Sequence, residues 1–143
     1  MPDVDPFAVE VERRRHLTIV QPRGELDLAT AETLRSMLEE AIADTLGAAL
    51  DGMEHEARLV LDLRSLSFID STGLHLLVAL DQRAQRDGFQ LTLLAPPAPI
   101  DRAIQLCGLD RTLPFAAPLD AVGTEPGESA PADRGSEASR DVS

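Results

Sequence analysis

The residues best suited to chemistry in this chain are Asp70, Ser71 and Thr72, which directly precede Gly73. They follow an apolar stretch and begin a segment with helical periodicity, so a carboxylate and hydroxyl groups are expected at the N-terminus of a helix. The first backbone N–H groups of a helix have no partner within it, and the helix dipole is positive there. A phosphate on Ser71 would be well placed at this end, so the pattern indicates regulation by phosphorylation.

The same segment is also typical of a simple helix cap, because Asp, Ser and Thr are preferred at the N-cap position. Two features favour a further function. Gly73 is a poor residue for a helix interior, costing about 1 kcal/mol relative to Ala, and it would let another protein approach the hydroxyl groups closely. The helix also carries apolar residues around nearly its full circumference, so part of them would form an exposed surface for a partner. These are Leu74, Leu76, Leu77, Val78, Ala79 and Leu80.

Other kinds of site find little support in the sequence. His16, His55 and His75 lie far apart, and none is spaced with Cys or Glu as metal ligands are, so no metal is expected. There is neither a Gly-x-Gly-x-x-Gly pattern nor a Gly-x-x-x-x-Gly-Lys-Ser/Thr loop, so no nucleotide cofactor is expected. Ile69 stands where the elbow of a hydrolase has glycine. An enzyme with Ser71 as nucleophile therefore ranks as a weaker alternative.

The composition excludes several classes of partner. The chain has 143 residues and a formal net charge of −12, and 43% of its residues are hydrophobic. This charge would repel nucleic acids, whose non-specific binding depends on Lys and Arg. No apolar stretch reaches the roughly 18 residues that a membrane helix needs, and the acidic N-terminus does not resemble a signal peptide. We therefore expect a cytoplasmic protein with no nucleic-acid partner and no membrane insertion.

Cys107 is the single cysteine of the chain, so it forms no intramolecular disulfide, as is common in a reducing compartment. It follows Leu106 near the end of a predicted short helix. A free cysteine usually packs as a small apolar residue, and we expect Cys107 to be buried.

The elements that would position Ser71 alternate between strands and helices. Gly47 and Gly52 predict a long loop that reaches about residue 56, and Pro22 and Gly24 predict the end of the second strand. Strands are expected at 7–11, 17–21, 59–63, 89–94 and 113–115, and helices at 30–46, 71–86 and 99–106. This order predicts an α/β fold with a mostly parallel sheet of roughly 4–5 strands, an antiparallel first strand and roughly 3–4 helices.

The sequence predicts a single domain with a tail. Residues 1–6 form an N-terminal extension and residues 7–116 the folded domain. Residues 117–143 carry six acidic and two basic side chains, interleaved with Gly, Pro and Ser. Such a segment buries too little apolar surface to fold, so we expect an acidic disordered tail.

Two stretches resemble the signatures of a known family. Residues 68–74 (Phe-Ile-Asp-Ser-Thr-Gly-Leu), preceded by residues 59–63 (Leu-Val-Leu-Asp-Leu), resemble the signature of bacterial anti-sigma factor antagonists, which are STAS-domain proteins. Residues 24–31 (Gly-Glu-Leu-Asp-Leu-Ala-Thr-Ala) resemble the second signature of that family, between the second strand and the first helix. The resemblance covers about residues 7–116, and it implies a STAS-like fold.

The resemblance implies a regulator of transcription rather than an enzyme. In that family, an anti-sigma factor with serine kinase activity phosphorylates the serine after the aspartate, which by position is Ser71, with Thr72 as second choice. The unphosphorylated antagonist binds the anti-sigma factor and so releases a sigma factor. The phosphorylated form dissociates, and a PP2C-type phosphatase restores it. A monomer or weak dimer is expected.

The resemblance also implies which residues contact the partner. Asp27 and Asp70 match family positions near the phosphoacceptor that help engage the kinase. The neighbouring candidates on the helix are Thr72, Gly73, Leu74 and Leu76. The alternative is a STAS scaffold or regulatory subunit of a lipid-transport or stress-signalling complex. The intact Asp-Ser-Thr-Gly sequence favours the switch, because a pure scaffold has less need of a hydroxyl group there.

Overall fold

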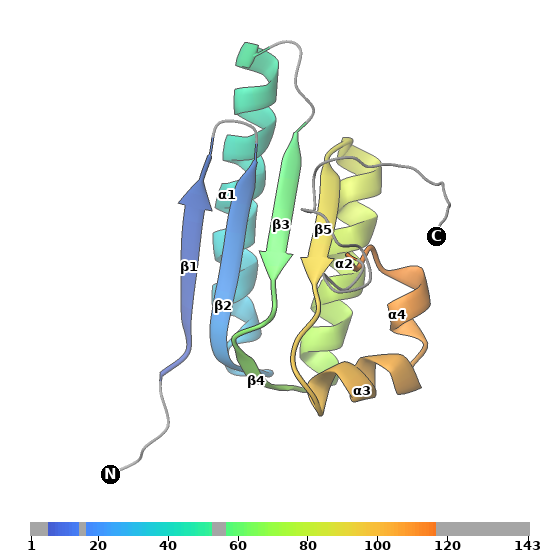
Figure 1. The fold of residues 1–143 in the computed structure, drawn as a ribbon. Helices are drawn as coiled ribbons and strands as arrows, with labels where there is room; N and C mark the ends of the chain where they lie inside the picture. The colour runs from blue at the N-terminus through green and yellow to red at the C-terminus, as the bar shows by residue number, and fades with distance from the viewer. Residues whose placement is uncertain (1–5, 15–16, 53–56, 117–143) are drawn as a thin grey trace.

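The computed structural model describes residues 6–14, 17–52 and 57–116, with the side chains of residues 48–52 left out of the description. The predicted acidic tail at 117–143 lies outside the described residues. The described part contains strands β1–β5 and helices α1–α4 (Figure 1). In chain order these are β1 (Ala8–Arg13), β2 (Thr18–Leu26), α1 (Ala31–Gly52), β3 (Arg58–Asp62), β4 (Leu66–Ile69), α2 (Ser71–Asp87), β5 (Gln90–Leu94), α3 (Ile100–Leu106) and α4 (Leu109–Thr112).

The strands form one mixed sheet, with the order β1-β2-β3-β5. Strand β1 runs antiparallel to β2, whereas β2, β3 and β5 run parallel to one another. The short strand β4 lies off this path and pairs in parallel with the end of β2. This arrangement confirms the predicted α/β fold with a mostly parallel sheet and an antiparallel first strand. It also brings the C-terminal ends of β2 and β4 together.

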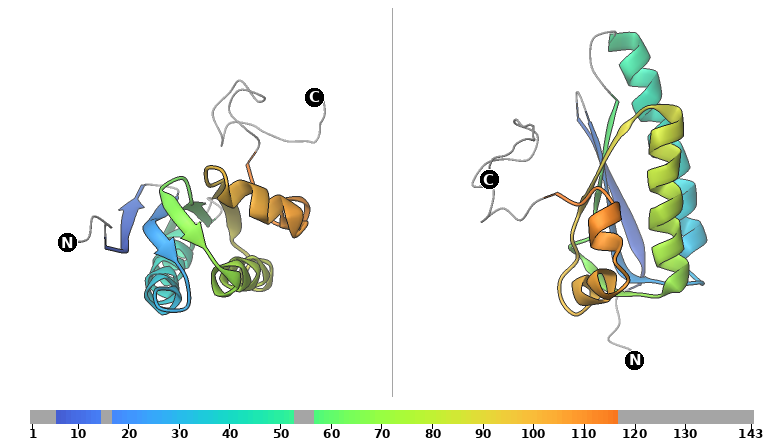
Figure 2. Two further views of the ribbon diagram at one scale, coloured as in Figure 1. Left: turned by 90° about the horizontal axis from the view of Figure 1, so that it is seen from below. Right: turned by 90° about the vertical axis from the view of Figure 1, so that its right-hand side faces the viewer.

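Helices α1 and α2 lie on the same face of the sheet, as the side view in Figure 2 shows. Their inner sides and the facing strand residues form a core of aliphatic side chains. Burying each such side chain contributes roughly 1.5–3 kcal/mol, so the sheet and the two helices hold each other in place. Fully buried members of this core include Val20, Leu26, Leu34, Leu59, Leu61, Leu77 and Leu93.

Helix α1 is longer than the sequence predicted, because it continues through Gly47 to Gly52. The loop predicted to begin at Gly47 is therefore wrong for residues 47–52, and residues 53–56 lie outside the described part. A single glycine weakens a helix by about 1 kcal/mol without ending it. Two alanines and a leucine follow Gly47, and these strong helix formers carry the helix onward.

Strand β2 also extends beyond its predicted end, through Pro22 and Gly24. Proline has no N–H for a sheet ladder, but β2 pairs with β3 only over residues 18–20 and with β4 only from Gly24 onward. Pro22 stands opposite Val9 of β1, but on the other edge of β2 it lies between the β3 and β4 ladders, so no donor is required on that edge. Gly24 has φ of 99° and precedes a shift in register, which is typical of a β-bulge. The extension carries the chain to Leu26 and Asp27 at the end of the sheet.

Strand β4 and the end of the domain differ from the predictions as well. Strand β4 was not predicted, because it is short and its exposed residues, Ser67 and Phe68, are adjacent rather than alternating. The segment predicted as an edge strand at 113–115 does pair with β5, but too briefly to form a strand. A short helix, α4, precedes this segment, and only an isolated bridge joins Phe115 to Leu93. Pro114 cannot donate to a ladder, which limits pairing at this edge.

Candidate functional site

The carboxylate of Asp70, and not a hydroxyl group, caps helix α2. Asp70 is the N-cap residue, with φ −111° and ψ −173°, and its Oδ1 accepts a hydrogen bond from the N–H of Gly73 at 3.1 Å. Ser71 is the first residue of the helix and is exposed. Its hydroxyl makes no hydrogen bond with any residue that the structure describes. The cap is therefore complete without Ser71, whose hydroxyl group remains available for modification.

The first turn of α2 has two backbone N–H groups without a partner in the described residues. In the first turn of α2, the N–H of Gly73 binds Asp70 Oδ1, and the N–H of Leu74 donates to the Asp70 carbonyl at 3.0 Å. The N–H groups of Ser71 and Thr72 bind no oxygen within the described ranges. These groups lie at the positive end of a helix of 17 residues, where an anion is stabilised.

The turn before α1 is held by a second aspartate. Asp27 Oδ1 accepts hydrogen bonds from the N–H groups of Ala29 at 3.0 Å and Thr30 at 3.2 Å. The hydroxyl of Thr30 donates to the carbonyl of Glu25 at 2.7 Å and accepts from the N–H of Asp27 at 2.9 Å. These bonds fix the backbone of residues 25–30, so the carboxylate of Asp27 has a defined place at the end of β2.

Asp70 joins this turn to helix α2. Its Oδ2 accepts a hydrogen bond from the N–H of Leu28 at 3.2 Å, and its own N–H donates to the carbonyl of Leu26 at 3.1 Å. The turn after β2 and the start of α2 lie at the same end of the molecule in Figures 1 and 2. The two signature segments are thus in direct contact. We call residues 25–28 and 68–71 together the signature surface.

The predicted partner-binding residues of α2 differ in how far they are buried. Thr72, Leu74 and Leu76 are half-buried, and Leu76 also lines a groove beside α1. Gly73 is buried, and a Cβ there would lie 2.6 Å from Ile69 Cγ1 and 2.9 Å from Leu26 Cγ. The expectation that Gly73 opens the first turn to another protein is therefore wrong. The glycine instead lets the helix pack closely against the sheet.

Two residues of the signature surface were missed by sequence reasoning. Leu28 is 77% exposed and Phe68 is 47% exposed. Phe68 was overlooked because it stands in an apolar stretch that suggested burial. The exposure of Leu28 could have been predicted, because it is an apolar residue in a segment that the sequence already assigned to a loop.

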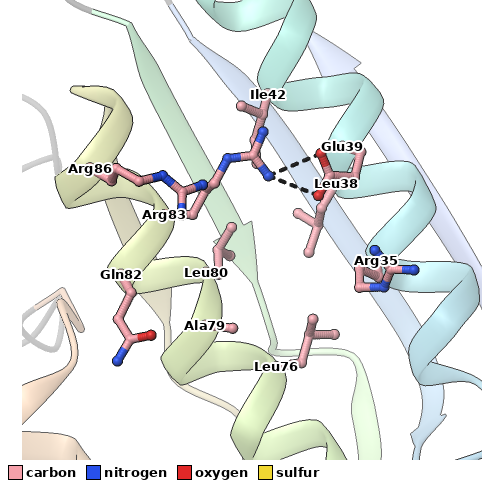
Figure 3. A pocket seen from close by; sticks show the side chains of 10 residues that line it. All are labelled: Arg35, Leu38, Glu39, Ile42, Leu76, Ala79, Leu80, Gln82, Arg83 and Arg86. Carbon is pink, nitrogen blue, oxygen red and sulfur yellow. Dashed lines mark hydrogen bonds and ion pairs between the residues drawn. The ribbon is translucent and has the colours of Figure 1, made fainter.

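The groove between α1 and α2, with a volume of about 260 Å³, is lined by arginines above an aliphatic floor (Figure 3). Arg83 Nη1 donates to both carboxylate oxygens of Glu39, at 3.0 and 2.8 Å, and its Nε pairs with Asp87 at 2.5 Å. Hydrogen bonds hold the pKa of Asp87 below its ordinary value, and the one from Arg83 contributes more than the one from Arg86. These arginines already have acidic partners, so the groove joins the two helices rather than offering a free anion site.

Cys107 is exposed at the C-cap of α3, so the prediction of a buried cysteine is wrong. His75 is exposed on α2, whereas His16 and His55 lie outside the described residues. Among the residues that the structure describes, no three His, Cys, Asp or Glu side chains gather as a metal site requires. None of the described helices has the length and apolar character needed to cross a membrane.

Comparisons with known proteins agree with this architecture. The family model described as the STAS domain matches residues 8–121. The chain is 29% identical over 107 residues to the anti-sigma F factor antagonist of Paenibacillus polymyxa, which is 75% of this chain and 84% of that protein. It is 30% identical over 108 residues to the anti-sigma-F factor antagonist RsfB of Mycobacterium tuberculosis, which is 76% of this chain and 80% of that protein.

A solved structure resembles the chain as well. The crystal structure of an anti-sigma factor antagonist from Mycobacterium paratuberculosis superposes with a TM-score of 0.61 at 27% identity, covering 81% of this chain and 90% of that one. The sheet order, the two aspartate-anchored turns and the family match agree with one another. The chain therefore belongs to the STAS-domain family.

Proposed function

We propose that this protein is a phosphorylation-switched antagonist of an anti-sigma factor. In its unphosphorylated form it binds an anti-sigma factor that is also a serine kinase, and so releases a sigma factor for transcription. The observation that carries this proposal is the exposed Ser71 hydroxyl at the start of α2, next to an aspartate that already caps the helix. The names of the relatives from Paenibacillus polymyxa and Mycobacterium tuberculosis support the same class of partner.

Phosphorylation would change the electrostatics of the signature surface. A phosphate adds about −1.5 to −2 charges at neutral pH. It would lie beside the carboxylate of Asp70, which is linked to the Asp27 turn through the N–H of Leu28. Like charges brought together in a desolvated interface cost several kcal/mol, which weakens binding about a hundredfold or more.

The free protein would tolerate the modification. The N–H groups of Ser71 and Thr72 and the positive end of the α2 dipole stabilise an added phosphate. Because Ser71 is exposed and outside the core, no buried contact is lost when it is modified. The switch therefore acts through the surface while the fold stays the same. The same exposure leaves the phosphate within reach of a PP2C-type phosphatase, which would reset the switch.

A nucleophilic enzyme is the weaker proposal for the same residue. A serine nucleophile needs an adjacent general base within hydrogen-bond distance. The Ser71 hydroxyl has no such contact within the described part of the chain, and the carboxylate of Asp70 already receives the N–H groups of Leu28 and Gly73. This geometry favours a modified residue over a catalytic one.

Binding measurements with Ser71 variants test the proposal. The probes are the purified anti-sigma factors with a kinase domain that the source organism encodes. Wild type and Ser71→Ala should bind one of them equally, whereas Ser71→Asp should bind it about a hundredfold more weakly. Ser36→Asp, which adds the same charge at an exposed position of α1, serves as the control and should bind like the wild type. Equal affinities for Ser71→Ala and Ser71→Asp, or no binding by any variant, would contradict the proposal.

A further inference from the structure

Large apolar side chains are exposed at few places in the described residues, namely at Leu28, Phe68 and Leu106. A single exposed apolar residue is ordinary in a folded protein. Leu28 and Phe68, however, both belong to the two segments of the signature surface that meet at Asp70. The N–H of Leu28 donates to Asp70 Oδ2. Phe68 lies in β4, two residues before Asp70, and pairs with Glu25 of β2. They therefore share the segments that hold Asp70, the residue before Ser71, whereas Leu106 ends α3.

Folding does not explain these side chains. Neither Leu28 nor Phe68 belongs to the hydrophobic core or to the half-buried residues that pack against it. A polar residue at either position would leave the core contacts of the domain unchanged. Exposed apolar area that folding does not require is typical of a surface that another protein covers.

Both side chains stand on rigid backbone. The turn that carries Leu28 is held on one side by Asp27 and Thr30 and on the other by Asp70. Phe68 lies within the β2–β4 ladder. Side chains presented on a fixed backbone lose little conformational entropy when they are buried by a partner, so they are well suited as anchors.

The charge around these anchors indicates the chemistry of the partner. The charged residues within 25–28 and 68–71 are Glu25, Asp27 and Asp70, which are all acidic. A protein that covers this surface needs apolar pockets for the two side chains and Lys or Arg opposite the carboxylates. A second copy of this chain fits poorly, because it would present the same acidic surface.

We propose that Leu28 and Phe68 are the two apolar anchors by which the signature surface docks on its anti-sigma factor, and that phosphorylation of Ser71 keeps them from being buried. This inference rests on the proposed function and adds the residues that supply the affinity. A phosphate next to the anchors would lose its water when they enter their pockets. Because burying an unpaired charge is strongly unfavourable, the anchors and the phosphate compete for the same interface.

Alanine variants of the anchors test this inference in the same binding assay. Leu28→Ala and Phe68→Ala should each weaken binding of the anti-sigma factor about tenfold or more, the loss expected for a central apolar contact. Leu106→Ala is the matched control, since Leu106 is as exposed as Leu28 but lies at the end of α3. It should bind like the wild type, and all three variants should melt at the wild-type temperature because no core contact changes.

A combined variant tests the link to phosphorylation. If the phosphate acts by keeping the anchors out of their pockets, Ser71→Asp should weaken binding less in a Leu28→Ala/Phe68→Ala background than in the wild type. Such non-additivity is the signature of coupled residues. Equal factors in the two backgrounds would overturn the link.

The outcomes separate this inference from the proposed function. If the wild type binds and the anchor variants bind equally well, the anchors are wrong while the proposed function stands. If these variants lose self-association measured by sedimentation but keep their affinity for the anti-sigma factor, the surface belongs to a second copy and the inference is overturned. If the wild type binds no anti-sigma factor, the proposed function fails, and the inference built on it fails too.

Discussion

At the scale of single residues, Gly73 shows that a signature position can be fixed by packing. A Cβ at Gly73 would lie within 3.0 Å of side-chain atoms of both Leu26 and Ile69, and these two residues are buried in the core. Gly73→Ala should therefore lower the free energy of unfolding by about 1–3 kcal/mol, although alanine is the better helix former by about 1 kcal/mol. Chemical denaturation of the two proteins measures this difference.

Gly47 provides the matched control for that experiment. It lies inside α1, and beyond its chain neighbours and the backbone of its own helix, a Cβ there would meet no atom of the described residues within 4 Å. Gly47→Ala should raise the free energy of unfolding by about 0.5–1 kcal/mol, because alanine restricts the unfolded chain and favours the helix. A Gly73→Ala protein as stable as the wild type would show that the first turn of α2 has more room than its contacts indicate.

At the scale of elements, Asp62 connects the end of β3 by hydrogen bonds to β2 and to the turn before β4. The carboxylate is buried and accepts hydrogen bonds from Arg64, in the turn before β4, at 2.9 to 3.0 Å, and from Gln21 of β2 at 3.2 Å. Burial alone would raise the pKa of Asp62. The hydrogen bonds and charge of Arg64, together with the hydrogen bond from Gln21, outweigh burial and hold this pKa below its ordinary value.

This lowered pKa predicts how stability depends on pH. The unfolded chain protonates Asp62 more readily than the folded one, so the stabilisation is present above the unfolded pKa of about 4 and is lost as the pH falls below it. The free energy of unfolding should therefore decrease on acidification, and Asp62→Asn should be less stable near neutral pH and lose less stability in acid. Asp110→Asn, at an exposed position of α4, is the control. Parallel pH curves for Asp62→Asn and the wild type would contradict this role.

The elements also show which parts of the fold a sequence reveals. Strand β3 was predicted from a nearly continuous apolar run, which is typical of a strand inside a parallel sheet. Strand β5 and helix α2 were predicted from the spacing of their apolar residues. Strand β2 was cut short at Pro22, since the gap between its two ladders depends on where β3 and β4 lie. Strand β4 escaped detection because its pairing with β2, rather than its own pattern, makes it a strand. Tertiary contacts decided these cases.

The site was predictable to a similar extent. The sequence placed Asp70 and Ser71 at a helix N-terminus, and the structure agrees. That Asp70 bonds to the backbone of Leu28 could not be predicted from residue types, because it depends on how the end of β2 meets the start of α2. The burial of Gly73 and the exposure of Leu28 and Phe68 also depend on how the end of β2 meets the start of α2.

At the scale of the whole molecule, the proposed switch requires no change of fold. The sheet and the helices α1 and α2 share one hydrophobic core, and Ser71 lies outside it. The net charge of −12 gives the chain a field that draws a basic partner at long range. In the proposed switch, phosphorylation would change one end of the domain, so the response would stay local.

The most direct test of this account combines phosphorylation with binding. The purified chain is incubated with ATP and the anti-sigma factor kinase that binds it, and the product is analysed by intact mass and peptide mapping. The proposed switch predicts one phosphate on Ser71, none on the Ser71→Ala variant, and an affinity of the phosphorylated protein about a hundredfold lower than that of the unmodified protein. Complete phosphorylation of Ser71 with unchanged affinity, or modification elsewhere while Ser71 stays unmodified, would contradict it.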